Sequence, residues 1–429
     1  MLLKTIIFFF LLITFIYTGS YGNFKIIFTV VVSLLPFLDL KRFFFFKSPN
    51  RMYLLLIFWL VYFGLSLLVG INSGFPYPNI RFIYRWFILL PMAFSIGHLI
   101  YRIFDLKEMH KLLEKITFII LIMSAVFYFL ELHGLTSNFR FLFPINSFSG
   151  LRAYTETLSL RAANQASLVF LLPFNIFNFH LNEKNLKNFP YLSFFNVFFG
   201  LFISVLGGRR ILQYSVFLIL INLVIVSLIN TFKKGTFNIR LIKDFFFLKY
   251  KFVFRLVLFG FIGFLIFYIL FTLQKIFSGD SLIQAYLSTL FAPFDFQQDE
   301  GSIIRISQNN ALFDGWLKAP LFGHGLTSYS KDFFRSLTTP WSYETFYTAL
   351  LFQAGIVGLF VFISTIYGTL FGFKIPLFLN LSKEKKLFYL MPISLIIFFI
   401  GCGTNPFWDN VAIWSLLFYS GLNLKDLKD

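Results

Sequence analysis

Long apolar runs separated by short polar links fill almost the whole chain. Most runs are long enough to cross about 30 Å of hydrocarbon as a helix, and none alternates apolar and polar residues as a barrel strand does. We therefore expect an all-α polytopic membrane protein with about twelve transmembrane helices. The expected spans are residues 2–18, 24–40, 51–70, 80–101, 113–132, 163–180, 188–206, 209–229, 253–274, 344–371, 386–404 and 408–424.

The first run, residues 2–18, carries Lys4 near its start and could be a signal peptide. A signal peptide ends at a small-residue cleavage site ahead of a hydrophilic domain, whereas here a second apolar run follows directly. We interpret residues 2–18 as an uncleaved first span.

The basic residues in the links predict the orientation, because cytoplasmic loops carry an excess of Lys and Arg. With the N-terminus inside, the cytoplasmic links and ends hold 24 of the 37 basic residues. An even number of spans returns the C-terminus to the same side. We therefore expect both termini in the cytoplasm.

The expected spans divide the chain into three parts. Residues 1–274 hold the first nine spans, residues 275–343 form a large outer loop, and residues 344–429 hold the last three spans. A loop of this length is usually functional or disordered. Its apolar residues recur with helical spacing, which predicts short helices folded over the bundle as a cap.

The composition agrees with a membrane protein and excludes several other classes. Hydrophobic residues make up 58% of the chain and charged residues 13%, and the mean hydropathy is +0.78. The net charge of +18 comes from residues in the links and not from a basic patch on a polar surface, so we expect no nucleic-acid partner. The single cysteine, Cys402, and five scattered histidines predict no disulfide, no metal site and no cofactor.

Arginine is concentrated in the links predicted to lie outside. Nine of the 13 basic residues there are Arg, against five of 24 inside. Because a guanidinium binds phosphate through two parallel hydrogen bonds, this bias indicates an anionic ligand on the outer side. The alternative is that these side chains extend to the membrane surface or pair with nearby acids. The outer arginines are Arg81, Arg85, Arg140, Arg152, Arg161, Arg209, Arg210, Arg305 and Arg335.

The sequence Gly207-Gly208-Arg209-Arg210 joins two expected spans. Two glycines favour a tight outer hairpin, which would bring both guanidiniums to the membrane surface. A lipid diphosphate is a suitable partner at that depth. Anchoring to ordinary lipid headgroups is the alternative.

Arg305 is followed in the large loop by Gly323-His324-Gly325. Glycines on both sides of the histidine allow close backbone approach, so this turn could frame a pocket. His324 could equally be an ordinary loop histidine.

An acidic residue opens the tenth expected span. Ser342 is the predicted N-cap, which places Glu344 in the first turn, on the same helix face as Tyr347 and Thr348. Acids favour helix N-termini for electrostatic reasons alone. Because this acid is expected beside the outer arginines, we predict that Glu344 is catalytic.

Two segments, residues 320–325 (PLFGHG) and 344–358 (ETFYTALLFQAGIVG), resemble the signature of the O-antigen polymerase and O-antigen ligase superfamily (Wzy-type). That signature has a proline, a G-x-G, a spacer, HN-x-YL and an apolar stretch with E-x-G-I-I-G. Arg209 after two glycines is similar to the Ser-Arg element of the family, and Arg305 stands where the family has a second arginine. Glu344 occupies the position of the histidine of the ligases, which favours a polymerase.

The resemblance implies a GT-C-like glycosyltransferase of the bacterial inner membrane. It would join undecaprenyl-diphosphate-linked repeat units in the periplasmic leaflet, without a metal and with inversion. The expected partners are undecaprenyl-diphosphate-linked oligosaccharides, membrane lipid and a chain-length regulator protein. The implied roles are catalytic base for Glu344, diphosphate binding for Arg209, Arg210 and Arg305, and further substrate contacts for His324, Arg161 and Tyr347.

Two other functions remain open. A ligase of the same superfamily would transfer finished polymer to lipid A–core. A flippase for the same lipid-linked sugar should carry ionisable residues within its spans and show two related halves. The spans here are mostly Phe, Leu and Ile, and no internal repeat is visible.

Overall fold

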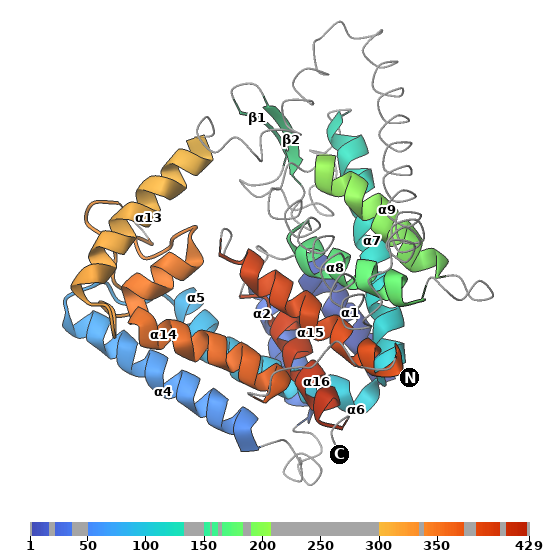
Figure 1. Cartoon of the computed structure of the whole chain (residues 1–429), viewed down its shortest axis with the longest axis horizontal. Coiled ribbons are helices and arrows are strands. Elements are labelled where there is room, and N and C mark those ends of the chain that lie inside the picture. Colours follow the sequence, from blue (N-terminus) through green and yellow to red (C-terminus); the bar gives the residue numbers. More distant parts are fainter. Residues whose placement is uncertain are drawn as a thin grey trace, which may run out of the picture. The chain divides into compact units, whose positions relative to one another are not determined.

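The computed structural model describes residues 2–16, 22–36, 50–132, 150–154, 157–161, 165–182, 190–206, 300–333, 339–372, 383–403 and 409–426. These residues form helices and one short β-hairpin (Figure 1). The predicted helical architecture is confirmed, while the hairpin was not expected. The chain forms two compact units, one of Met1–Leu112, Phe296–Pro376 and Glu384–Asp429 and the other of Leu113–Asp295 and Leu377–Lys383.

Ten of the twelve expected spans coincide with helices. The other two, residues 209–229 and 253–274, lie outside the described residues. The helices of the first unit are α1 Leu2–Ile16, α2 Gly22–Leu34, α4 Asn50–Asn72, α5 Ile80–Ile83, the π-helix η2 Tyr84–Ile88, α6 Leu89–Ile103, α13 Glu300–Lys318, α14 Phe346–Phe371, α15 Lys383–Gly401 and α16 Val411–Asp426. Helix α7, Leu106–Leu132, begins in the first unit and continues into the second, which also holds β1 Gly150–Tyr154, β2 Thr157–Arg161, α8 Gln165–Asn182 and α9 Tyr191–Leu206.

Within the described ranges, three helices are long and apolar enough to cross a membrane: Arg51–Asn72, Ile80–Ile103 and Phe346–Phe371. Shorter apolar helices, such as Leu2–Ile16, rise about 1.5 Å per residue and so fall short of a hydrocarbon layer of about 30 Å. Length and composition therefore define a helical membrane protein.

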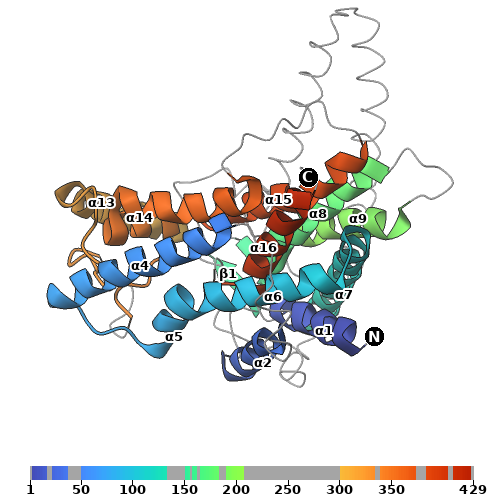
Figure 2. The ribbon, with the colours of Figure 1, turned by 90° about the horizontal axis from the view of Figure 1, so that it is seen from below.

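Close helix contacts build the core of the first unit. Helices α4 and α14 run side by side, as both views show (Figures 1 and 2). Helix α6 packs on α16 at Gly97, where an added Cβ would lie 2.7 Å from the carbonyl oxygen of Ser415. Small residues at such contacts let helix backbones approach in membranes. The indole of Trp59 is buried between Trp86 and Trp414 and donates a hydrogen bond to the Trp86 carbonyl (2.8 Å).

The described part of the large loop contains a helix of 19 residues, α13, where short helices were expected. Residues 275–299 and 334–338 of that loop lie outside the described residues. In both views α13 lies beside the beginning of α14 (Figures 1 and 2). The contact includes Leu312 of α13 and Ala349 and Phe352 of α14, all buried.

In the second unit, β1 and β2 pair antiparallel with Gly150 opposite Arg161. The expected outer link 133–162 therefore contains a hairpin. Polar side chains join the three helices of this unit: Glu114 and Thr117 from α7, Asn175 and Asn178 from α8, and Ser193 and Asn196 from α9. We call these six residues the Glu114 cluster.

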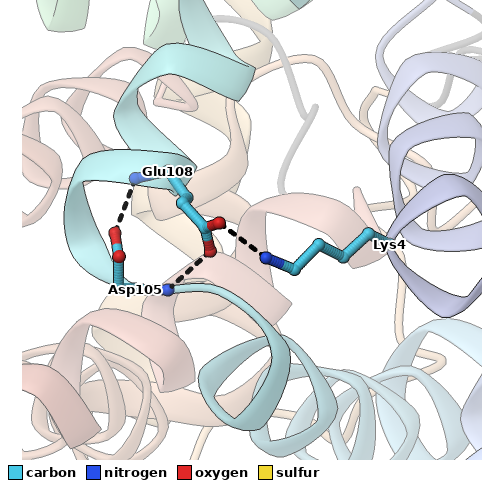
Figure 3. Close-up of polar contacts among 3 residues, drawn as sticks. All are labelled: Lys4, Asp105 and Glu108. Carbon is cyan, nitrogen blue, oxygen red and sulfur yellow. Dashed lines mark hydrogen bonds and ion pairs between the residues drawn. The ribbon is translucent and has the colours of Figure 1, made fainter. Parts of the chain in front are cut away.

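A charged contact closes the first turn of α7 (Figure 3). Asp105 accepts a hydrogen bond from the Glu108 amide (2.7 Å), and Glu108 accepts one from the Asp105 amide (3.3 Å). This reciprocal arrangement is a capping box, which satisfies amides that a helix start leaves open. The other carboxylate oxygen of Glu108 binds the Lys4 ammonium at 2.6 Å.

Candidate functional site

Helix α14 is interrupted at Gly355, whose φ of 67° and ψ of −172° are not helical. An interruption within a membrane helix is tolerated only where other groups satisfy the released backbone atoms. Residues 320–325 do this through four hydrogen bonds to residues 352–357, and we call this contact the clasp. The amides of His324 and Gly325 donate to the carbonyls of Phe352 (3.0 Å) and Gln353 (2.8 Å), and those of Ile356 and Val357 donate to Pro320 (3.0 Å) and Leu321 (3.1 Å).

Glycines allow the clasp to form. A Cβ on Gly323 would lie 2.5 Å from the carbonyl carbon and oxygen of Gln353, and a Cβ on Gly355 would collide with the Leu321 carbonyl. A Cβ on Gly325 would likewise collide with the backbone of Gly70 in α4. The close backbone approach predicted for the Gly-His-Gly turn is therefore present, and it joins this turn to α4 and α14.

The imidazole of His324 is held by structural contacts. Its Nε2 lies 2.8 Å from the Gly315 carbonyl of α13 and donates a hydrogen bond to it. The ring also lies 4.9 Å from the ring of Phe352. These contacts favour the reading of His324 as a loop histidine that fixes α13 against α14.

The predicted catalytic residue lies beside one of the predicted arginines. Arg305 Nε of α13 donates to Glu344 Oε2 at 3.0 Å, although 39 residues separate the two in the chain. Their side chains are 28% and 19% exposed, so neither is fully buried by the described residues. Among the residues that the structure describes, none accepts a hydrogen bond from the terminal Nη atoms of Arg305.

The predicted start of α14 was wrong. The helix begins at Phe346 with Thr345 at the N-cap position, so Ser342 does not cap it and Glu344 lies before its first turn. Glu344 therefore does not share a helix face with Tyr347, and the Tyr347 hydroxyl instead donates to the carbonyl of Phe399 in α15.

Tertiary contacts explain the late helix start. The amide of Phe346 donates to the Gly403 carbonyl (3.2 Å), outside α14. Just before, the buried hydroxyl of Tyr343 accepts a hydrogen bond from the Ser330 amide (2.7 Å). Burial raises the pKa of Tyr343 to about 12, so this hydroxyl remains neutral at ordinary pH. These two tertiary contacts, and not a local N-cap, determine the conformation of the segment just before α14.

The other predicted site residues that the structure describes are not part of this contact. Arg209 and Arg210 lie outside the described residues, so their predicted hairpin stays a prediction. Arg161 ends β2 in the second unit. The structure thus brings together Arg305 and Glu344, with His324 and Tyr347 on neighbouring elements of the same unit.

A second ion pair was missed in the sequence. Arg85 Nε of η2 lies 2.6 Å from Asp409 Oδ2, in the segment just before α16. Arg85 had been counted only among the outer arginines. The available signal was that Asp409, like Glu344, stands immediately before an apolar run whose start is predicted to lie outside.

Comparison with models of protein families, with curated proteins and with solved structures finds no match for this chain. The class of the protein therefore follows from its own features. It is a helical membrane protein in which an interrupted apolar helix lies next to an arginine–carboxylate pair.

Proposed function

We propose that this protein is a Wzy-type polysaccharide polymerase. It joins undecaprenyl-diphosphate-linked repeat units in the periplasmic leaflet of the bacterial inner membrane, with both termini in the cytoplasm. The proposal includes about twelve spans and a GT-C-like arrangement. The observation that supports it is the contact between Arg305 and Glu344, because a carboxylate can act as a base and a guanidinium can bind phosphate.

The arrangement of the signature segments adds support. Residues 320–325 and 344–358, which carry the resemblance, bind each other through the clasp. The same segments hold α13 against α14, and these two elements supply Arg305 and hold Glu344 in place. If each segment resembled the family signature independently of the other, the two segments would not need to be in contact in the fold.

The proposed reaction is a displacement at the anomeric carbon of the donor sugar. The Glu344 carboxylate takes the proton of the acceptor hydroxyl, whose oxygen forms a bond to C1, a role worth about 10²–10⁴-fold in rate. The bond from C1 to the diphosphate oxygen breaks, and the diphosphate leaves with the electron pair. Arg305 stabilises the charge that develops on it. A single displacement inverts the configuration at C1.

In the resting structure Arg305 binds Glu344 through Nε. A guanidinium has further N–H groups on its two Nη atoms. A diphosphate can therefore bind Arg305 without first displacing Glu344, so both side chains remain in one site while the carboxylate faces the acceptor hydroxyl.

The test is the expression of variants in a strain that lacks its own polymerase. Glu344→Gln and Arg305→Ala should each accumulate single repeat units, while membrane extracts contain normal amounts of protein. Lys4→Gln, which removes an ion pair elsewhere in the first unit, is the matched control and should restore the full ladder. Long polymer from both Glu344→Gln and Arg305→Ala would contradict the proposed mechanism.

The same strain distinguishes a ligase. A polymerase restores the ladder of chain lengths, whereas a ligase restores only the attachment of preformed polymer to lipid A–core. If the protein restores attachment without a change in chain length, the proposed function is a ligase and not a polymerase.

A flippase is the second candidate, and the Glu114 cluster with the interrupted α14 favours it. Transporters combine interrupted helices with polar sites inside the membrane. Proteoliposomes that carry a fluorescent lipid-linked sugar separate the two functions. A flippase moves the label between leaflets without changing its length, and a polymerase lengthens it.

A further inference from the structure

Arg85 and Asp409 form an ion pair that resembles the pair of Arg305 and Glu344, although only Arg305 Nε has the geometry of a hydrogen bond. In each, the Nε atom of an arginine contacts a carboxylate, at 2.6 Å and 3.0 Å respectively. The exposed fractions are also similar, 33% and 20% against 28% and 19%. Each carboxylate stands just before a helix, α16 or α14.

The second pair lies close to the first within the same unit. The ring of Trp341, three residues before Glu344, lies 6.0 Å from the ring of Phe82, which is three residues before Arg85. On the other side, the amide of Phe346 donates to Gly403, six residues before Asp409. The segment that holds Glu344 is therefore in contact with both chain segments that lead to the second pair.

In both pairs the arginine contacts the carboxylate through Nε, and the two Nη atoms lie at the other end of the guanidinium. An arginine held through Nε still has four N–H groups on Nη1 and Nη2, and this fork matches two oxygens of a phosphate. Within the described part of the chain, no residue accepts a hydrogen bond from the Nη atoms of Arg85. The carboxylate fixes the arginine and leaves its fork for a ligand.

The backbone at Arg85 is also unusual. Arg85 stands in the π-helix η2, which interrupts an otherwise α-helical apolar segment. Single π turns are rare and occur often at functional sites. Here the indole of Trp59 donates to the Trp86 carbonyl next to Arg85 and so supports the turn.

We propose that Arg85, positioned by Asp409, binds the phosphate of a second lipid-linked diphosphate beside the one bound at Arg305. This inference rests on the proposed function, because joining two lipid-linked units brings two diphosphates to one site. The chemistry that Arg85 recognises is a phosphate anion, which a lipid diphosphate or free pyrophosphate could supply.

The experiment measures binding to the full-length protein purified in detergent. Farnesyl diphosphate, farnesol and inorganic pyrophosphate are titrated separately by calorimetry. The wild type should bind two molecules of farnesyl diphosphate per chain, and farnesol and pyrophosphate each at least about tenfold more weakly than farnesyl diphosphate. In Arg85→Gln one of the two sites should weaken by about tenfold to a hundredfold, the range expected for lost hydrogen bonds to a charged group.

Three further variants separate binding from folding. Arg85→Lys keeps a positive charge for Asp409 but lacks the fork, so it should also weaken one site at an unchanged thermal midpoint. Asp409→Asn should weaken the same site less, because it only loosens the arginine. Lys4→Gln should leave both sites unchanged.

Each other outcome has a defined meaning. Two intact sites in both Arg85→Gln and Arg85→Lys, with one lost in Arg305→Gln, would overturn this inference and leave the proposed function in place. Unchanged binding in Arg305→Gln as well would count against the proposed function itself. Pyrophosphate that binds as tightly as farnesyl diphosphate would refute the lipid-linked ligand.

Discussion

Two acidic residues of the first unit, Glu108 and Glu344, each bind a basic side chain that is distant in the sequence, but their local surroundings differ. Glu108 closes the capping box of α7 and also binds Lys4 (Figure 3). Glu344 lies before the first turn of α14 and meets an arginine 39 residues away. Helix capping explains the position of the Glu108 carboxylate, whereas tertiary contacts hold the segment that carries Glu344.

The surroundings of the two pairs differ in the same way. The side chains of Lys4 and Glu108 are 45% and 44% exposed, and such surface pairs contribute little to stability. Arg305 and Glu344 are more enclosed and depend on the clasp and on the buried Tyr343 for their positions. Both pairs join residues that are far apart in the chain, so sequence distance does not distinguish them. The lower exposure of Arg305 and Glu344 and their place next to the interrupted helix α14 make them the better candidate for function.

The largest effect should follow from Gly355→Ala. The residue has a backbone conformation that is essentially restricted to glycine, and the new Cβ would collide with Leu321. We expect a loss of more than about 3 kcal/mol and failure of Arg305 to meet Glu344. Size-exclusion chromatography and the thermal midpoint in detergent would measure it.

Gly74→Ala is the control for this substitution. Gly74 also has a positive φ, but no atom lies within 4 Å of its added Cβ. It should cost only about 1 kcal/mol. Equal effects of the two substitutions would show that the clasp adds nothing to stability.

Substitutions of Glu344 and of Glu108 should have different effects on polymer synthesis. Glu344→Gln should lower polymer synthesis by about 10²–10⁴-fold with an unchanged thermal midpoint. Glu108→Gln should leave synthesis unchanged, because its carboxylate is used in the capping box and the Lys4 pair. Polymer assays on purified protein would compare them, and equal losses in both variants would remove the distinction.

Acid should weaken the region around Glu108 through His110, two residues further along α7. Burial lowers the pKa of His110 from 6.5 to about 4, so the unfolded chain takes up a proton at higher pH than the folded one. Stability is therefore complete above pH 6.5 and falls as the pH drops toward 4, by up to about 3 kcal/mol. Thermal midpoints at several pH values would show this, and His110→Phe should have a smaller decline than the wild type.

The smallest effect should come from the capping box. Asp105→Ala removes the side chain that accepts from the Glu108 amide, and a lost N-cap costs about 1 kcal/mol. The thermal midpoint should fall slightly, with polymer synthesis unchanged. A large fall in synthesis would show that this end of the unit influences the site.

The sequence predicted the helices well because each depends on its own apolar residues. It did not predict the interruption of α14, since Gly355 departs from the helix only with residues 320–325 beside it. The start of α14 was wrong because Gly403, far along the chain, takes the Phe346 amide. The Glu114 cluster was missed because each of three apolar runs contributes only two of its polar residues.

The clasp also has a consequence for biosynthesis. Four backbone groups of α14 would lack partners in lipid without residues 320–325, at a cost of several kcal/mol for each group. The ribosome synthesises residues 320–325 before α14. These residues, which are the partners of the released backbone groups, are therefore already outside the exit tunnel when Gly355 emerges. Insertion of α14 is thus coupled to the preceding loop, and the helix reaches its final form only after that loop has folded back against it.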